Sequence, residues 1–528
     1  MPMAMSRRAL LQSVAATTAA LSAPAVANAA TTVTFIPSSD LLGIDPIWTT
    51  AYVVRNHGYL VYDTLYSTDA NYQIQPQMAE AHDISPDGLT VSIRLRDGLR
   101  FHDGPPVLAR DCVQSIRRWA ARDGLGQMMM GLTNELGAVD DRTLRFRLKS
   151  RFPLLIPALG KLSSSVPFMM PERVAVTDPN TQIKDATGCG PFRFLADEWV
   201  QGSRAAYAKF TDYVPRPEPA SGAGGGKHVN IDRLQWLTIP DFSTAVATLQ
   251  TAAADWMEAP PVDLVPTLSN NKDIIVRPYD ELGYPFILRF NHLQAPFNDV
   301  KAREAVLAAV KQSVYLQAAV GNPQYERECK SYMPCGTPYS TGAGSGAMVG
   351  SLDQAKKLLA ESKYDGVRIV ILQPTDNQIL NASCAVTYDL LKKMSMNVEL
   401  AASDIASMMR RRASQEPVDK GGWSLFVTSA ASVEYANPAA HLGLRSDGAV
   451  AWAGWPTDPR MEELRRNFIF APDDAARKKI AADIEQEAFT AVPYVPLGQY
   501  IQPTAYRRSL TDLLLPSSAP FFWNMHKV

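Results

Sequence analysis

The run LRDGLRFHDG occupies residues 95–104 and lies between a strand pattern and a helix pattern. Residues 89–95 alternate apolar and polar side chains, which is typical of a half-exposed strand. Residues 109–121 place Val113, Ile116 and Trp119 on one side of an expected helix. The Asp-Gly pairs within the run are turn dipeptides. Strand, turns and helix in close succession predict a mixed α/β architecture.

The same two periodicities continue outward in both directions along the chain. Apolar alternation and short apolar runs predict strands at residues 32–36, 143–148, 234–239, 367–372, 397–400, 425–428 and 494–500. Helical spacing predicts helices at residues 52–65, 300–320, 351–359, 379–394, 460–470 and 473–489. A proline-bounded loop is expected at 167–171. Because strands and helices alternate throughout, the fold class is α/β or α+β.

Length and composition exclude several classes of protein. The chain has 528 residues, 46% of them hydrophobic and 20% charged, which is ordinary for a globular protein. The chain has 52 Lys and Arg against 53 Asp and Glu. It therefore lacks the excess of basic residues typical of a nucleic-acid-binding protein and the high net charge typical of a disordered protein. At roughly 150 residues per domain, the length predicts two to four domains.

The first 29 residues have the order of an export signal. Arg7 and Arg8 precede an uncharged stretch at 10–26, and Ala27-Asn28-Ala29 is a small-x-small cleavage site. The paired arginines after a serine resemble a twin-arginine (Tat) signal, and an ordinary Sec signal is the alternative. No later segment offers 18 uninterrupted apolar residues, so we expect an exported, soluble mature chain.

Five cysteines are too few for a disulfide scaffold. Cys329 and Cys335 lie six residues apart, and the Pro-Cys-Gly turn can bring them within disulfide range. A metal site is the alternative, although two cysteines without a nearby histidine match zinc spacing poorly. Cys112, Cys189 and Cys384 have apolar or glycine-rich neighbours and are expected to be buried.

Motifs of catalysis are missing from the sequence. It contains neither G-x-S-x-G nor H-E-x-x-H, and its seven histidines are scattered. The glycine-rich run at 222–227 lacks phosphate-loop spacing, because His228 stands where Ser or Thr is needed. The residues therefore favour a binding protein over an enzyme, with no cofactor and no metal.

A series of short motifs carries a family resemblance. They are GIDP at 43–46, VYDTL at 61–65, PQMAE at 76–80, SPDGL at 85–89, the run at 95–104, ARDCV at 109–113, TGCGPF at 187–192, FN at 290–291 and APFNDV at 295–300. Their order and spacing resemble extracellular solute-binding protein family 5, the peptide-, nickel- and opine-type receptors of ABC importers. The resemblance extends over residues 31–528.

The resemblance implies a type II periplasmic-binding-protein fold of the large kind (cluster C), with two lobes, a hinge and an extra subdomain in the first lobe. It places the core of lobe I at 30–62, 188–280 and 497–528, the extra subdomain at 63–187 and lobe II at 281–496. It further implies a periplasmic, monomeric receptor. Such a receptor closes its lobes on a solute and docks on a membrane permease and its ATPase.

The resemblance also implies where ligand contacts lie. In this family the segment after the Asp-Pro turn lines the cleft, which points to Thr50 and Tyr52, and the loop with Cys189 lies near the opening. A segment ending in Pro438 matches the one that carries an acid for a peptide's amino group. It contributes the candidates Ser429, Ser432, Glu434 and Tyr435.

Glu434 departs from the family pattern, in which the acid is usually Asp and follows a Trp that Ala and Ser replace here. As a cleft acid it would anchor an ammonium by charge-assisted hydrogen bonds. If Glu434 is instead a solvated loop acid, the expected ligand is a non-peptide solute, such as an opine, a sugar-like molecule or a carboxylate. Nickel is disfavoured because His441 is the only nearby histidine. A ligand sensor and, less favoured, an exported hydrolase complete the alternatives.

Overall fold

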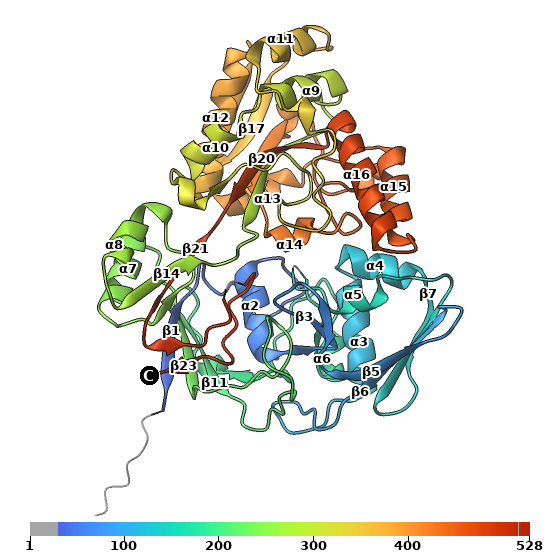
Figure 1. Ribbon diagram of the computed structural model, residues 1–528, viewed down its shortest axis with the longest axis vertical. Helices are drawn as coiled ribbons and strands as arrows, with labels where there is room; N and C mark the ends of the chain where they lie inside the picture. The colour runs from blue at the N-terminus through green and yellow to red at the C-terminus, as the bar shows by residue number, and fades with distance from the viewer. Residues whose placement is uncertain (1–29, 164, 516) are drawn as a thin grey trace, which may run out of the picture.

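Two lobes, each built around its own sheet, lie one above the other in the computed structural model (Figure 1). The structure describes residues 30–163, 165–515 and 517–528. The predicted export signal at 1–29, with Arg7 and Arg8, therefore lies outside the described residues.

A seven-stranded sheet forms lobe I. Its order is β10 (Phe192–Phe194), β11 (Arg204–Lys209), β12 (Arg233–Leu237), β1 (Thr32–Ile36), β13 (Trp256–Met257), β21 (Pro503–Arg507) and β14 (Ile274–Pro278). β1 pairs in parallel with both β12 and β13. Because β1 alternates, Val33 and Phe35 face a core with α2 (Tyr52–Val61), while Ile36 packs with α7 (Phe242–Gln250) and α8 (Val265–Ser269).

An antiparallel subdomain extends lobe I. Its sheet order is β5 (Ala79–Ile84), β6 (Thr90–Leu95), β8 (Thr143–Leu148) and β7 (Thr133–Ala138). Its helices are α3 (Ala109–Ala120), α4 (Gly124–Gly131), α5 (Leu155–Leu159) and α6 (Glu172–Ala175). The same part of the chain holds two short antiparallel pairs: β2 (Asp63–Thr64) with β9 (Phe168–Met169), and β3 (Tyr66–Thr68) with β4 (Ile74–Pro76).

Lobe II is a six-stranded sheet between helices. The order is β16 (Glu326–Arg327), β20 (Tyr494–Tyr500), β15 (Tyr284–Phe290), β19 (Leu425–Ser429), β17 (Ile369–Pro374) and β18 (Val398–Ser403). The helices are α9 (Val300–Ala309), α10 (Gln312–Ala319), α11 (Leu352–Ala360), α12 (Gln378–Lys393), α13 (Ile405–Arg412), α14 (Ser432–Tyr435), α15 (Pro459–Ile469) and α16 (Asp474–Ala491).

The chain crosses between the lobes in two neighbouring segments. One leads from β14 to β15, and the other from β20 to β21. They run antiparallel, with the Tyr279 amide donating to the Gln502 carbonyl over 2.8 Å and Tyr284 opposite Tyr500. Two adjacent crossings form a hinge on which the lobes can open and close.

Most predicted elements are confirmed, with strands at 32–36, 143–148 and 494–500 matching to the residue. The single helix predicted at 300–320 is wrong, because the chain is extended at Val310 and Lys311. The buried Gln312 side chain starts the second helix by bonding Cys329 and Pro496 carbonyl oxygens over 2.7 and 3.0 Å. The helix predicted at 52–65 ends at Val61, and β9 lies inside the predicted loop at 167–171.

A disulfide joins Cys329 to Cys335, whereas the other three cysteines are free and buried. Two buried side chains hold the closed loop. Gln312 accepts from the Cys329 amide over 2.7 Å, and Gln499 accepts from the Cys335 amide over 2.7 Å. The loop is thereby fixed to α10 and to the hinge strand β20.

Replacing both bridging cysteines, Cys329→Ser with Cys335→Ser, is expected to lower the free energy of unfolding by about 2 kcal/mol, because a short closed loop no longer restricts the unfolded chain. Urea unfolding measures the change. Reducing the wild-type protein should reproduce it, and Cys384→Ser controls for burying a serine. Equal unfolding midpoints for oxidised and reduced wild type would contradict the prediction.

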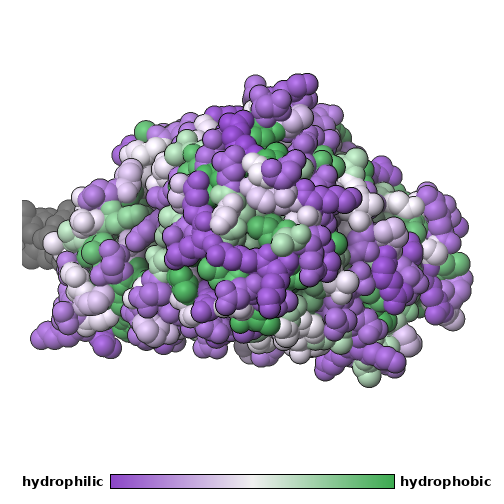
Figure 2. Space-filling model, turned by 90° about the horizontal axis from the view of Figure 1, so that it is seen from above, coloured by the Kyte–Doolittle hydropathy of each residue, from purple (hydrophilic) through white to green (hydrophobic). Residues whose placement is uncertain are grey.

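The face of lobe II seen from above is mostly hydrophilic, with apolar residues in small separate groups (Figure 2). In the described part of the chain, no helix is both long and apolar enough to cross a membrane.

Candidate functional site

The N-terminal end of α2 lies on the side of lobe I that faces lobe II (Figure 1). The Tyr52 hydroxyl accepts a 2.7 Å hydrogen bond from the Ala431 amide of lobe II. Burial and the nearby Glu434 carboxylate raise the pKa of Tyr52. One turn later, the Arg55 guanidinium lies 4.6 Å from the centre of the Tyr52 ring. This helix therefore supplies both a phenol and a cation to the interlobe surface.

Ser163 links the two lobes through its hydroxyl group. Arg55 Nη1 donates to Ser163 Oγ over 2.8 Å, and Ser163 Oγ donates to Glu434 Oε1 over 3.0 Å. The remaining hydrogen bonds of the guanidinium go to Asn56 Oδ1 and to the Ser518 carbonyl. Arg55 is 4% exposed, so its charge is held in a largely dry setting.

The short helix α14 carries Glu434 and is fastened to the hinge at its first residue. The Ser432 amide donates to the Gly283 carbonyl over 3.0 Å, and its hydroxyl donates to the Leu282 carbonyl over 2.8 Å. Gln499 donates to the same Leu282 carbonyl over 2.7 Å. A side chain on Gly283 would lie 2.4 Å from the Tyr500 carbonyl, so this close approach requires glycine. These contacts fix the start of α14 against the hinge.

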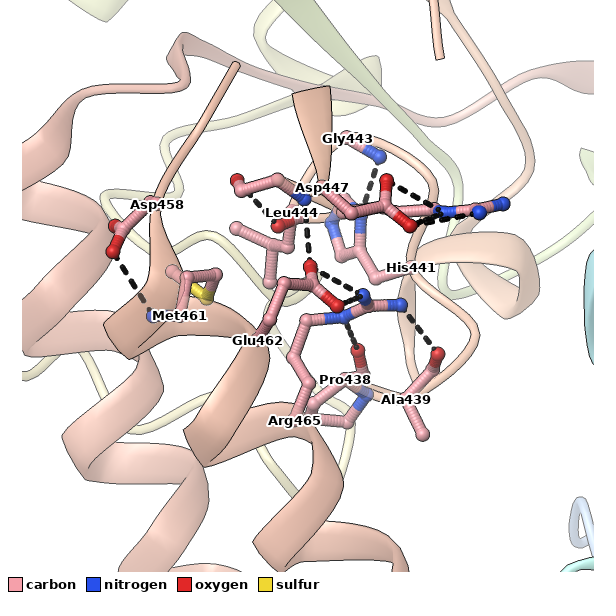
Figure 3. Close-up of polar contacts among 12 residues, drawn as sticks. Pro438, Ala439, His441, Gly443, Leu444, Asp447, Asp458, Met461, Glu462 and Arg465 are labelled. Atoms are coloured by element: carbon pink, nitrogen blue, oxygen red, sulfur yellow. Dashed lines mark hydrogen bonds and ion pairs between the residues drawn. The ribbon is translucent and has the colours of Figure 1, made fainter. Parts of the chain in front are cut away.

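The segment after α14 is anchored on α15 (Figure 3). Arg465 donates to the carbonyls of Pro438 and Ala439 and pairs with Glu462, which accepts from the Ser446 amide over 2.7 Å. The Tyr435 ring stacks on His441 with a centroid distance of 4.4 Å. Both ends of α14 are thus held, which places Glu434 on the side facing lobe I.

Aromatic side chains line the hinge side of this contact. Tyr284 and Tyr500 stack at 5.2 Å, and Tyr52 lies 6.5 Å from Tyr284. Burial raises the pKa of all three phenols, so they remain neutral hydrogen-bonding groups at ordinary pH. Ligand clefts commonly combine such aromatic walls with a few placed polar groups.

Two further acids lie near Arg55. Glu258 is 5% exposed and accepts from the Ser38 amide, from Asn56 and from the Tyr279 hydroxyl. Asp280 lies in the first hinge crossing; burial raises the pKa of its carboxyl group, and Arg55 opposes this rise. The interlobe group therefore consists of one guanidinium, three carboxylates and several tyrosines. We call these residues (Tyr52, Arg55, Glu258, Tyr279, Asp280, Tyr284, Glu434 and Tyr500) the interlobe group.

A surface pocket of about 250 Å³ lies at the C-terminal ends of β1 and β12. Its lining includes Ser38, Asp40, Thr238, Phe242 and Met257. The Ser38 amide binds Glu258 over 2.7 Å, so this pocket adjoins the interlobe group. The carboxyl ends of parallel strands are the usual ligand edge of an α/β sheet.

The predicted site residues fall into two sets. Tyr52, Ser432, Glu434 and Tyr435 lie at or directly beside the interlobe contact, and Ser429 ends β19 next to Tyr500. Thr50 is exposed on the loop before α2, and Cys189 is buried, its thiol directed to the Met169 carbonyl at 3.6 Å. The structure does not bring Thr50 and Cys189 into the interlobe group, and their ligand contacts stay predictions.

Sequence reasoning missed Arg55, Ser163, Glu258 and Asp280. One signal was present for Arg55, because three consecutive polar residues at 55–57 interrupt an otherwise apolar helix and all three are buried. Buried polar residues in a helix need partners and so mark a special site. No local pattern distinguishes Ser163 or Asp280. Among the described residues, no cluster of three or more His, Cys, Asp or Glu side chains is arranged to hold a metal ion.

Two lobes joined by a double hinge, with charged and aromatic side chains meeting between them, define a bilobal solute-binding protein. The model of the bacterial extracellular solute-binding proteins, family 5 (middle region), matches residues 73–449. The chain belongs to this family.

Relatives agree with this assignment. The probable peptide ABC transporter periplasmic-binding protein y4tO of Sinorhizobium fredii is 38% identical over 534 residues, covering 99% of this chain and all of that one. Two solved structures share the fold at low identity. One is the binding protein AgaA of A. tumefaciens in complex with agropinic acid, with a TM-score of 0.78 and 20% identity, covering 94% of this chain and 99% of that one. The other is a Pseudoalteromonas dipeptide-binding protein in complex with Met-Leu, with a TM-score of 0.77 and 17% identity, covering 94% of this chain and 100% of that one.

The fold is that of the type II periplasmic-binding proteins. Proteins of this family are transport receptors of ABC importers and not enzymes. They bind peptides or other small ligands and work with a membrane permease and an ATPase. The expected class of protein is therefore confirmed.

Proposed function

We propose that the chain captures short peptides, or closely similar polar solutes with a free amino group, between its lobes. The observation that carries this proposal is the position of Glu434, which contacts Ser163 of the opposite lobe over 3.0 Å. A peptide ammonium takes the place of the Ser163 hydroxyl as donor to this carboxylate. An ammonium donor adds a full positive charge, so its ion pair with the carboxylate is stronger than the hydroxyl–carboxylate hydrogen bond that it replaces. The 38% identity to a probable peptide-binding relative supports the same ligand class.

Closure follows from the same residues. Tyr52 to Ala431 and Ser163 to Glu434 are contacts that only the closed arrangement makes, since each joins residues of different lobes. A ligand that touches both lobes binds the closed state better than the open one and shifts the population toward it. The closed receptor is then the form that docks on the permease.

We further propose a monomeric, periplasmic receptor exported by the signal at 1–29. The division into 30–62, 188–280 and 497–528 for the core of lobe I, 63–187 for its subdomain and 281–496 for lobe II belongs to this proposal. The membership of the three large sheets supports it, because each sheet draws its strands from one of these sets apart from the boundary strand β20.

Trialanine is expected to raise the melting temperature of the protein, whereas N-acetyl-trialanine has little effect because acetylation removes the ammonium. Glu434→Gln should weaken trialanine binding by about tenfold to a hundredfold, the value of a charge-assisted hydrogen bond. A thermal-shift titration followed by calorimetry measures both. Ligand at a hundredfold excess over Kd adds about 2.7 kcal/mol of stability.

Glu361→Gln, an exposed acid at the end of α11, is the matched control and should bind like wild type. Equal affinity for free and acetylated peptides, or binding that survives Glu434→Gln, would contradict the amine contact. Binding of an opine or a sugar acid in the absence of any peptide binding would overturn the peptide proposal itself.

A further inference from the structure

Asp280 is a buried acid with one oxygen left without a partner. It lies between β14 and β15 in the first hinge crossing and is 0% exposed. Oδ1 accepts from the Leu282 amide over 2.9 Å and from the Tyr72 hydroxyl over 3.2 Å. Oδ2 has no hydrogen-bond partner among the described residues. A buried carboxylate oxygen in this state carries a desolvation penalty that a bound donor would relieve.

The neighbouring guanidinium of Arg55 does not donate a hydrogen bond to Asp280 Oδ2. Burial raises the pKa of Asp280 and the nearby Arg55 opposes this rise, but the hydrogen bonds of Arg55 in the described chain go to neutral oxygens of Asn56, Ser163 and Ser518. Glu258, in contrast, already accepts from three donors. Of the acids around Arg55, Asp280 is thus the one with a buried oxygen available to a further donor.

Formal charge points in the same direction. The interlobe group holds the carboxylates of Glu258, Asp280 and Glu434 against the single guanidinium of Arg55. Charges brought together in a setting of low dielectric interact strongly, so this excess of negative charge favours a ligand with more than one cationic group. One ammonium at Glu434 leaves a second negative site at Asp280.

Tyr72 of lobe I makes one of the two hydrogen bonds to Asp280 Oδ1. Its side chain is 41% exposed, it belongs to the turn between β3 and β4 of lobe I, and its hydroxyl reaches across to the hinge. A ligand donor at Oδ2 needs no loss of the Leu282 contact, because that contact is made by Oδ1.

We propose that Asp280 is a second cation-binding residue of the cleft and that the solute is a peptide with a Lys or Arg side chain in addition to its free amino group. This inference rests on the proposed function, in which Glu434 takes the peptide ammonium. Asp280 then acts as a specificity-determining residue that selects cationic peptides over neutral ones of the same size.

Calorimetric titration with two matched tripeptides tests the inference: Ala-Lys-Ala and Ala-norleucine-Ala, which differ only in the side-chain ammonium. Wild type is expected to bind the lysine peptide at least about tenfold more tightly. Asp280→Asn should reduce this preference to less than about threefold, chiefly by weakening binding of the lysine peptide. Glu434→Gln should weaken both peptides by a similar factor and so keep the preference.

Tyr72→Phe provides a second variant, since it removes the hydroxyl contact across the hinge but keeps the Asp280 carboxylate. It should retain the preference for lysine. Equal affinity of wild type for the two peptides would overturn the role of Asp280 while the proposed function stands. A preference that persists in Asp280→Asn would also overturn it. Failure of every peptide to bind would instead overturn the proposed function, and this inference with it.

Discussion

Lowering the pH from 7 to 4.5 is expected to reduce the free energy of unfolding by about 5 kcal/mol through His57 and His441 alone. Burial lowers the pKa of both side chains to about 3 in the folded protein. In the unfolded chain their pKa is about 6.5. Between pH 3 and pH 6.5 the unfolded state therefore binds protons that the folded state does not bind. The contribution of these two histidines to the free energy of unfolding is therefore fully present above about pH 6.5 and is lost as the pH falls toward 3.

The contacts of the two histidines explain why neither accepts a proton readily. His57 Nδ1 bonds the Tyr207 hydroxyl over 3.0 Å, and its ring packs edge-on against Phe194 at 5.0 Å. His441 Nδ1 accepts from the Gly443 amide over 3.1 Å (Figure 3), while Nε2 faces the Tyr332 carbonyl at 3.1 Å. Protonation of His441 at Nδ1 would break the contact with Gly443.

Urea unfolding at a series of pH values between 7 and 4.5 measures this loss. His57→Gln should flatten the dependence of the free energy of unfolding on pH by about 1.4 kcal/mol per pH unit, the value of one proton. The same slope in His57→Gln as in wild type would show that His57 does not contribute.

Replacing Lys227 by Met is expected to lower the free energy of unfolding by about 3–5 kcal/mol, because it leaves the Asp63 carboxylate buried without its cation. Lys227 Nζ lies 2.8 Å from Asp63 Oδ1, and the two side chains are 0% and 1% exposed. The ammonium also lies 4.8 Å from the centre of the Trp523 ring. Among the described residues, the other donors to Asp63 are neutral: the Thr64 amide at 2.9 Å, the Tyr213 hydroxyl at 2.8 Å and Gln77 at 3.4 Å.

The double variant Asp63→Asn with Lys227→Met tests whether the unpaired Asp63 charge causes the loss of stability. Removing both charges should restore most of the lost stability, since the large effect arises from the orphaned charge and not from the loss of attraction. Lys393→Met, which breaks an exposed pair with Asp389, should change stability by less than about 1 kcal/mol. Equal destabilisation in the single and double Lys227 variants would contradict the argument.

The sequence predicts the fold well where a segment's own side chains decide its structure. Strands at 143–148 and 494–500 have a clear apolar pattern, and the structure reproduces them to the residue. The prediction fails at Val310, where no proline or glycine marks the break. There, side-chain contacts of Gln312 to residues far along the chain begin a new helix. Such contacts leave no trace in a local window.

The site is less predictable for the same physical reason. Glu434 and Tyr52 were found through the family resemblance, and both lie at the interlobe contact. Ser163 and Asp280 acquire their character only from neighbours contributed by other parts of the chain. A serine in a loop and an aspartate after a strand are ordinary in sequence. Their significance arises when the two lobes meet.

The positions of the hinge strands β20 and β21 determine when the two sheets can be completed as the chain is synthesised. β20 completes the sheet of lobe II beside β15, and β21 fills the place between β13 and β14 in lobe I. Until residues 494–507 have left the ribosome, both sheets keep open edges that can pair wrongly. One segment of the chain therefore completes both sheets, which couples the folding of the two lobes.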